Sequence, residues 1–375
     1  MTAAPRYDFA VIGAGIAGAS LAAELAPYAR VLVLEAEEMP GYHATGRSAA
    51  FWDECYGGPG VVPLTLSSGA FLRENGFLRE SGALYIGRAQ DKRAMDEFMR
   101  SFAGTGVTIE RLGREGLEAR VPFAREDWCD AIWEPACANI DVAALHQRYL
   151  KTMRAGGADL VCRSRVASLK RCEGEWRITC EDGATHRAAG LVNAAGAWAD
   201  HVAAMAGARP LGIKPLRRTV VQLRVAPDAP DNLPLVIDIN GCFYFKSESG
   251  RLWLSPHDEV PSAACDAAPE EIDVALAIDR FRQVADWRIE AVEHRWAGLR
   301  SFSPDRLPVY GPDPEVAGFN WFAGQGGYGI QTAPAAARIA AQLLLDHGPD
   351  AMTVAIDAEA YSPARYYEKV PAKVG

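Results

Sequence analysis

A glycine-rich turn near the N-terminus places the strongest constraint on how this chain folds. The apolar run Tyr7–Ile12 predicts a buried strand, and the alanine-rich stretch Ala17–Leu25 predicts a helix. Between them, Gly13, Gly15 and Gly18 follow the spacing Gly-x-Gly-x-x-Gly. A strand that passes through such a turn into a helix is typical of a dinucleotide-binding fold.

Each glycine of this turn has its own expected role. Gly13 permits the tight turn, Gly15 lets the backbone approach a pyrophosphate, and Gly18 lets the helix and strand pack closely. The helix N-terminus offers unpaired N–H groups and a partial positive charge to phosphates. A second predicted strand, 30–34, ends at Glu35, where an acid bonds a ribose hydroxyl and repels the 2′-phosphate of NADP. A purely structural glycine turn is the alternative.

A second glycine-rich turn, Gly326–Thr332, lies near the far end of the chain. It follows a strand expected at Asn320–Gly324 and opens an alanine-rich helix, Ala333–Leu344. A single ligand that contacts residues from both ends of the chain is expected to be long and extended, which favours FAD over NAD. The positive end of this helix suits the electron-rich edge of a reduced flavin. An ordinary helix N-cap is the alternative.

Composition sets the class of protein. A chain of 375 residues with 49% hydrophobic and 23% charged residues suits two globular domains. The net charge of −9 argues against a nucleic-acid partner. The eight cysteines lack metal-ligand spacing, so we expect no metal and reduced thiols in a cytoplasmic protein. We expect no signal peptide and no membrane span, because no run of about 20 apolar residues occurs.

The order of predicted elements indicates an α/β protein with an interrupted nucleotide domain. Alternating segments between 219 and 255 predict an antiparallel sheet in an α+β second domain. Ser48–Ala50 is expected to open a helix, and the last twenty or so residues are expected to form a surface tail. We assign 1–78, 140–212 and 298–375 to a Rossmann-like FAD-binding domain of the glutathione-reductase type, and 79–139 and 213–297 to a substrate-binding domain.

Five segments resemble the D-amino-acid oxidase and dehydrogenase family of FAD enzymes, which includes glycine oxidase and sarcosine oxidase. They are Val11–Gly18, Gly41–Ala50, Val192–Trp198, Trp296–Arg300 and Gly324–Thr332. The resemblance runs through nearly the whole chain, and within the family it is greatest to the bacterial D-arginine dehydrogenases. It implies non-covalent FAD and hydride transfer from the α-carbon of an amino acid to flavin N5, giving an imino acid that water hydrolyses.

The resemblance also implies site residues. Arg218 and Arg300 would bind the substrate carboxylate, helped by Tyr56 and Tyr244, and the Gly327 carbonyl would accept from the substrate amine. Arginine suits this task because its guanidinium forms a bidentate fork to a planar carboxylate. The implied cofactor residues are Gly13, Gly15, Ile16, Ala17, Gly18, Glu35, Ala36, Thr45, Arg47, Ser48, Ala49, Ala50, Val166, Ala195, Gly196, Trp198, Gly298, Arg300, Gly326, Gly327, Tyr328, Gly329, Ile330, Gln331 and Thr332.

Two positions depart from the D-arginine dehydrogenases. Phe51 stands where they carry a histidine, and Ala83 stands where a glutamate receives the substrate guanidinium. Binding a cation without that acid costs on the order of 2 kcal/mol. We therefore expect a neutral or aromatic substrate side chain, although Asp53 and Glu54 are nearby acids that could restore an amine contact.

Several alternatives remain open from the sequence. Either Arg217 or Arg218 faces the pocket, and His43 offers a less favoured covalent attachment for the flavin. The donor is a D-amino acid, or else a secondary or cyclic amine, an N-alkyl amino acid or a 2-hydroxy acid. The electron acceptor is oxygen or a quinone. A flavin-binding structural or tRNA-modifying protein is disfavoured by the acidic charge and the arginines.

Overall fold

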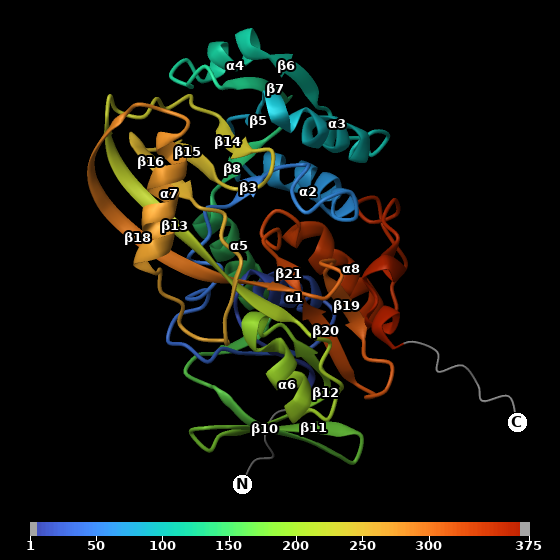
Figure 1. Cartoon of the computed structure of the whole chain (residues 1–375). Coiled ribbons are helices and arrows are strands. Elements are labelled where there is room, and N and C mark those ends of the chain that lie inside the picture. The colour runs from blue at the N-terminus through green and yellow to red at the C-terminus, as the bar shows by residue number, and fades with distance from the viewer. Residues whose placement is uncertain (1–5, 368–375) are drawn as a thin grey trace, which may run out of the picture. The chain divides into compact units, whose positions relative to one another are not determined.

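The computed structural model describes residues 6–367, which fall into two compact units (Figure 1). Among the described residues, unit 1 comprises 6–46, 142–215 and 300–367, and unit 2 comprises 47–141 and 216–299. The prediction was wrong for 47–78, which belong to unit 2. The reason is that β3 (Phe51–Trp52) and β4 (Leu78–Glu80) both pair with β8 (Ala138–Ile140). The indole of Trp52 also donates to the carbonyl oxygen of Thr65.

Unit 1 is built on a sheet whose central strands are parallel. They run in the order β9 (Asp159–Val161), β2 (Val31–Leu34), β1 (Arg6–Ile12), β12 (Thr185–Asn193) and β20 (Phe319–Ala323). The hairpin of β10 (Val166–Cys172) and β11 (Glu175–Cys180) extends β12, and β19 (Val309–Pro312) pairs antiparallel with β20. Helix α1 (Ile16–Leu25) packs against α5 (Val142–Ala155) and α8 (Ala333–Leu345) (Figure 1).

The turn from β1 into α1 depends on two glycines. Gly13 has φ +102°, and a Cβ at this position would lie 2.6 Å from the Ala194 carbonyl oxygen. A Cβ at Gly18 would overlap the Gly13 carbonyl oxygen. The tight turn at Gly13 and the close packing at Gly18 are therefore confirmed, because no side chain fits at either place.

Unit 2 is built on a larger sheet. It runs in the order β18 (Arg288–Phe302), β13 (Lys214–Ala226), β16 (Arg251–Ser255), β15 (Tyr244–Glu248), β14 (Leu235–Asp238), β5 (Ala83–Arg88), β7 (Trp128–Glu134) and β6 (Glu110–Gly113). β17 (Val260–Pro261) pairs with β13, and the end of β18, within unit 1, pairs with β21 (Gln325–Gly326). The sheet is mixed and not antiparallel as predicted, because β14 pairs parallel with β5. These two strands lie far apart in the chain, so no hairpin forces them to be antiparallel.

The two faces of this sheet pack differently. Leu84, Val221 and Phe245 belong to one core cluster with Phe281 of α7 (Glu271–Arg282). Ala83, Tyr85 and Tyr244 belong to a different cluster with Cys55 and Ile132. Successive side chains of a strand point to opposite faces, so the second cluster marks the face turned away from α7. The remaining helices of unit 2 are α2 (Val62–Glu74), α3 (Lys92–Ser101) and α4 (Arg114–Arg120).

Three further expectations were wrong. Ser48–Ala50 opens no helix and instead leads as irregular backbone into β3. The strand expected over 160–169 is divided into β9 and β10, because Arg163 in the linker adopts φ +55°. The C-terminal segment forms two short 3₁₀ turns, 358–361 and 363–366, and its Tyr361 is buried with its ring 5.8 Å from that of Tyr310. Among residues 6–367, every helix is too short or too polar to cross a bilayer.

Candidate active site

The predicted phosphate-binding turn in unit 1 is closed by two side chains. The backbone N–H of Ala14 donates to Glu35 Oε2 at 2.8 Å, and that of Ile16 donates to Thr45 Oγ1 at 2.9 Å. Glu35 Oε1 accepts from the N–H of Glu37 at 3.0 Å, which fixes the carboxylate in place. Four of the predicted cofactor residues, Gly15, Ile16, Glu35 and Thr45, therefore lie together where α1 begins.

A histidine supports this turn from α5. His146 Nε2 lies 2.9 Å from the Ala14 carbonyl oxygen, so an imidazole protonated at Nε2 donates to it. The ring also packs against Gly41, where a Cβ would approach His146 Cε1 to 2.8 Å. Burial lowers the pKa of His146, so the ring is neutral at physiological pH. Sequence reasoning missed this residue, because a histidine within a predicted helix does not reveal which distant residues it contacts.

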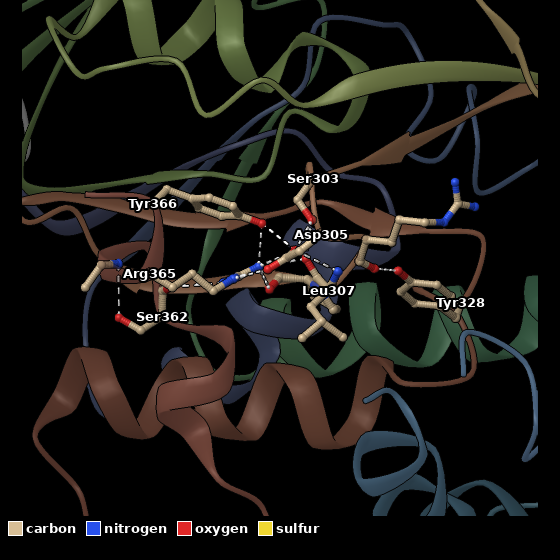
Figure 2. A network of polar contacts seen from close by, with 10 residues as sticks. Ser303, Asp305, Leu307, Tyr328, Ser362, Arg365 and Tyr366 are labelled. Carbon is tan, nitrogen blue, oxygen red and sulfur yellow. Dashed lines mark hydrogen bonds and ion pairs between the residues drawn. The ribbon is translucent and has the colours of Figure 1, made fainter. Parts of the chain in front are cut away.

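The second glycine-rich turn is held by a polar network (Figure 2). The Tyr328 hydroxyl donates to the Arg306 carbonyl oxygen in the loop 303–308. Arg365 Nε donates to Asp305 Oδ2 at 2.7 Å, and Arg365 Nη2 donates to the carbonyl oxygen of Leu307 at 2.9 Å. Burial alone would raise the pKa of Asp305, but hydrogen bonds from Arg365 and Tyr366 lower it to about 2. The C-terminal segment thus fixes the loop that supports Tyr328.

The other predicted cofactor residues are divided between the units. Gly196 and Trp198 form a 3₁₀ turn after β12, and the Trp198 ring lies 4.8 Å from that of His43. In unit 2, Arg47 Nη1 donates to the carbonyl oxygens of Ala267, at 2.8 Å, and Ala297, at 3.3 Å. Unit 1 holds Ile16, Ala17, Ala36, Val166, Ala195, Arg300 and Gly326 to Thr332, and unit 2 holds Arg47, Ser48, Ala49, Ala50 and Gly298.

The structure separates the two neighbouring arginines of β13. Arg217 pairs with Glu270 and, at 2.9 Å, with Asp273, which lie at the start of α7. Arg218 is only 3% exposed, and its Nε donates to the Asp258 carbonyl oxygen at 2.7 Å. Arg217 therefore faces α7, and Arg218 points to the face that also carries Tyr244.

Aromatic rings gather on that face of unit 2. The rings of Phe51 and His257 lie 5.9 and 5.8 Å from that of Tyr244, both edge-on. The ammonium group of Lys246 lies 4.9 Å from the Phe51 ring centre and donates to Asn139 Oδ1 at 2.9 Å. Burial lowers the pKa of Lys246. Sequence reasoning missed Lys246, although its position two residues after Tyr244 in a strand places it on the same face.

Asp53 and Glu54, the acids expected to contact a substrate amine, are both buried, and Asp53 is hydrogen-bonded within the protein. Both oxygens of Asp53 accept from the Tyr85 hydroxyl, at 2.9 and 2.7 Å, and Asp53 is 2% exposed. Glu54 is also buried. Ala83, the predicted replacement for an acid, is fully buried and packs in the same cluster as Tyr85 and Tyr244. The Asp53 carboxylate is thus saturated with donors from the protein itself.

A family model described as FAD dependent oxidoreductase matches residues 8–343. The chain belongs to the FAD-dependent oxidoreductase family. FAD is therefore its cofactor, and the α/β fold of the family matches the fold described above.

Named relatives of this FAD-dependent oxidoreductase align along almost the whole chain. The glycine oxidase of Geobacillus kaustophilus is 26% identical over 388 residues, covering 97% of this chain and 98% of that protein. The hydrogen cyanide synthase subunit HcnC of Pseudomonas aeruginosa is 25% identical over 414 residues, covering 96% of each. The crystal structure of the same glycine oxidase superposes with a TM-score of 0.82 at 24% identity, covering 95% of this chain and 98% of that one. That of L-proline dehydrogenase from P. horikoshii superposes with a TM-score of 0.83 at 22% identity, covering 97% and 98%.

The turn in unit 1 fits the pyrophosphate of this FAD-dependent oxidoreductase's cofactor. Gly13 and Gly18 leave no space for a Cβ, so only glycines allow the tight turn and the close helix packing that shape this turn. Gly15 directly precedes α1, whose first N–H groups form a positive helix end. Glu35 closes the same turn, at the end of the second strand, where a ribose would be recognised.

Proposed function

We propose that this protein oxidises a D-amino acid at its α-carbon, with a neutral or aromatic substrate side chain. The observation that supports the proposal is Arg218 of β13, a buried guanidinium on the same face of the unit 2 sheet as Tyr244 of β15. A buried arginine beside tyrosine hydroxyls is suited to a carboxylate, because the guanidinium fork forms two parallel hydrogen bonds to it.

Each proposed substrate residue has a distinct task. Arg218 and Arg300 bind the α-carboxylate, and the hydroxyls of Tyr56 and Tyr244 complete its hydrogen bonds. The Gly327 carbonyl accepts from the substrate amine and so orients the α-carbon. The Asp258 carbonyl oxygen accepts from Arg218 Nε, and Glu259 Oε1 accepts from Arg218 Nη2 at 3.4 Å, which together fix the plane of the guanidinium.

The proposed cofactor residues follow the same division of labour. Gly13, Gly15, Gly18 and Glu35 hold the adenosine diphosphate portion, and the turn 326–332 meets the flavin, which is bound non-covalently. FAD supplies a two-electron acceptor at flavin N5. Because a hydride leaves the α-carbon directly, the protein needs only an uncharged amine and good alignment and no strong base.

The surroundings of Ala83 support a substrate without a positive charge. Phe51 and Tyr244 present aromatic rings, and the Asp53 carboxylate is saturated by Tyr85 and backbone donors. The Asp53 carboxylate is therefore not available to a cationic side chain of the substrate. Glycine oxidase activity in the relative from Geobacillus kaustophilus agrees with a small, uncharged amino acid.

A second candidate keeps the flavin and changes the donor to a secondary or cyclic amine, an N-alkyl amino acid or a 2-hydroxy acid. The fold match to an L-proline dehydrogenase, whose substrate is a cyclic secondary amine, favours keeping this candidate. The acceptor is oxygen or a quinone in either case. We also place the protein in the cytoplasm, because all eight cysteines are free thiols.

Anaerobic mixing of the FAD-loaded protein with a panel of substrates tests the proposal. The panel contains D-amino acids, the matched L-enantiomers, N-methyl amino acids, proline and 2-hydroxy acids, and the measurement is loss of the visible band of oxidised flavin. We expect neutral and aromatic D-amino acids to bleach the flavin fastest. Faster bleaching by N-methyl amino acids or proline would favour the second candidate, and a panel that leaves the band intact would refute both.

A further inference from the structure

Two buried acids lie behind the substrate-side face of unit 2 and take no part in the proposed reaction. Asp53 follows β3, and Glu134, which is fully buried, ends β7. A carboxylate oxygen of each and the Cys55 Sγ lie within 4.8 Å of one another. Two carboxylates this close and shielded from water cannot both be ionised without a compensating proton or cation.

The hydrogen bonds indicate which acid keeps its charge. Asp53 Oδ1 accepts from the backbone N–H groups of Cys55 and Tyr56, each at 2.9 Å, and both of its oxygens accept from Tyr85. In contrast, no N–H or O–H group of the described residues donates to Glu134 Oε2, which is buried. An ionised Asp53 is therefore well stabilised, and Glu134 Oε2 is the atom on which a proton is needed.

The neighbouring ionisable groups agree with this assignment. Burial raises the pKa of Asp53, whereas the hydrogen bond between the two carboxyl groups lowers it. Burial, the Asp53 charge and the same hydrogen bond all raise the pKa of Glu134. The other ionisable groups acting on the pair are Glu54 and Cys55 in the loop, Tyr85 on β5 and the buried Cys137, and none of these is a cation. The cation Lys246 acts on Cys137 and is paired with Glu248. A proton is thus the available source of compensation.

We propose that Asp53 and Glu134 share one proton, carried by Glu134 Oε2, and in that state position the loop that presents Tyr56 to the substrate carboxylate. The contacts are to consecutive backbone groups, because Glu134 Oε1 accepts from the N–H of Glu54 at 2.7 Å and Asp53 accepts from the next two. The pair consists of positioning residues that act through Tyr56, and this part of the inference rests on the proposed function.

Glu134 also affects the part of the substrate-side face that would receive the substrate side chain. It lies directly across from Ala83 in the β5–β7 ladder, so both side chains point to the same face. With the proton on Glu134, the acid nearest Ala83 is neutral. The pair therefore carries one negative charge, which hydrogen bonds from Tyr85 and two backbone N–H groups stabilise.

Glu134→Gln and Glu134→Ala form the decisive pair of variants. A glutamine Nε2–H donates to Asp53 as the protonated carboxyl does, and its Oε1 still accepts from the Glu54 N–H. We expect Glu134→Gln to keep KM within about twofold of the parent and Glu134→Ala to raise KM roughly tenfold, with FAD still bound, since a hydrogen bond to a charged group is lost. In a Tyr56→Phe background, Glu134→Ala should add little, because residues acting through one another are not additive.

Two measurements need no substrate and separate this inference from the proposed function. The infrared spectrum of the holoenzyme should contain the carbonyl stretch of a protonated carboxyl group, which Glu134→Gln should remove. Elemental analysis should find no stoichiometric divalent cation. The inference is overturned if Glu134→Gln is as damaging as Glu134→Ala, if the infrared band is absent, or if a bound metal accounts for the charge. A band without any effect on KM would overturn the role assigned to the Tyr56 loop.

Discussion

Arg217 and Arg218 are adjacent in the chain, and their guanidinium groups lie on opposite faces of β13. Arg217 pairs with Glu270 and Asp273, whereas Arg218 is fixed by the Asp258 carbonyl oxygen. The two guanidinium groups therefore have different interaction partners. Arg217 ties α7 to the sheet, and Arg218 is the arginine that we assign to the substrate carboxylate.

Methionine substitutions at these two positions should therefore differ in kind. Arg218→Met should lower kcat/KM by about 2–3 kcal/mol in transition-state stabilisation, because a charge-assisted pair to the carboxylate is lost. Arg217→Met should leave kcat/KM near the parent value and reduce the free energy of unfolding by roughly 3 kcal/mol, because it leaves the buried Asp273 carboxylate without its ion-pair partner. Steady-state kinetics and denaturant unfolding measure both, and equal kinetic losses would remove the distinction between the faces.

Arg300→Met should raise the reaction barrier by several kcal/mol, measured as a fall in kcat/KM, while the flavin stays bound, because we assign the Arg300 guanidinium to the substrate carboxylate. The measurement is turnover normalised to bound FAD. Loss of flavin with normal turnover in the remaining holoenzyme would instead assign Arg300 to the cofactor.

Gly18→Ala should abolish FAD binding and lower the free energy of unfolding by at least about 2 kcal/mol, because the new Cβ would overlap the Gly13 carbonyl oxygen. Gly348→Ala is the matched control, since a Cβ there meets no atom within 4 Å. Flavin content after purification and thermal unfolding report the two effects. A Gly18→Ala protein that retains full flavin would contradict the described helix-to-strand packing.

The Asp305–Arg365 pair should make stability depend on pH in acid. The pKa of Asp305 is lowered from 3.8 to about 2 in the folded protein, so its stabilising contribution is present above its unfolded value and lost as the pH falls through about 2. Because Asp305 is largely open to solvent, we expect at most about 1 kcal/mol. Arg365→Met should flatten this dependence between about pH 4 and pH 2 in denaturant unfolding, and unchanged curves would contradict the pairing.

Ala83→Glu should shift the substrate preference towards cationic D-amino acids by on the order of 2 kcal/mol in relative kcat/KM, because it restores an acid at that position. Ala83→Gln serves as the uncharged control of the same size. Because Ala83 is fully buried, the larger side chain of either variant should also lower the free energy of unfolding. The comparison of D-arginine with a neutral D-amino acid in both variants measures the shift.

The nucleotide half of the fold could be predicted because its signals are local. A buried strand, Gly13 and Gly18 in the turn, and a helix follow one another within twenty residues, and backbone sterics allow few other structures. Two features of unit 2 could not be predicted from the sequence. They are the parallel pairing of β14 with β5 and the position of 47–78 in unit 2 and not in the nucleotide-binding unit. Both depend on pairings between segments that are distant in the chain.

The sequence by itself determined the family and the cofactor, since both depend on short motifs whose geometry the backbone dictates. Only the tertiary structure decided that Arg217 faces α7 and that Arg218 lies on the opposite face of β13, because both carry the same charge and only packing against α7 distinguishes them. The same holds for Asp53 and Glu134, which are about eighty residues apart in the chain. They come close together only when β3 and β7 are brought into one core, where burial allows only one of the two carboxyl groups to be ionised.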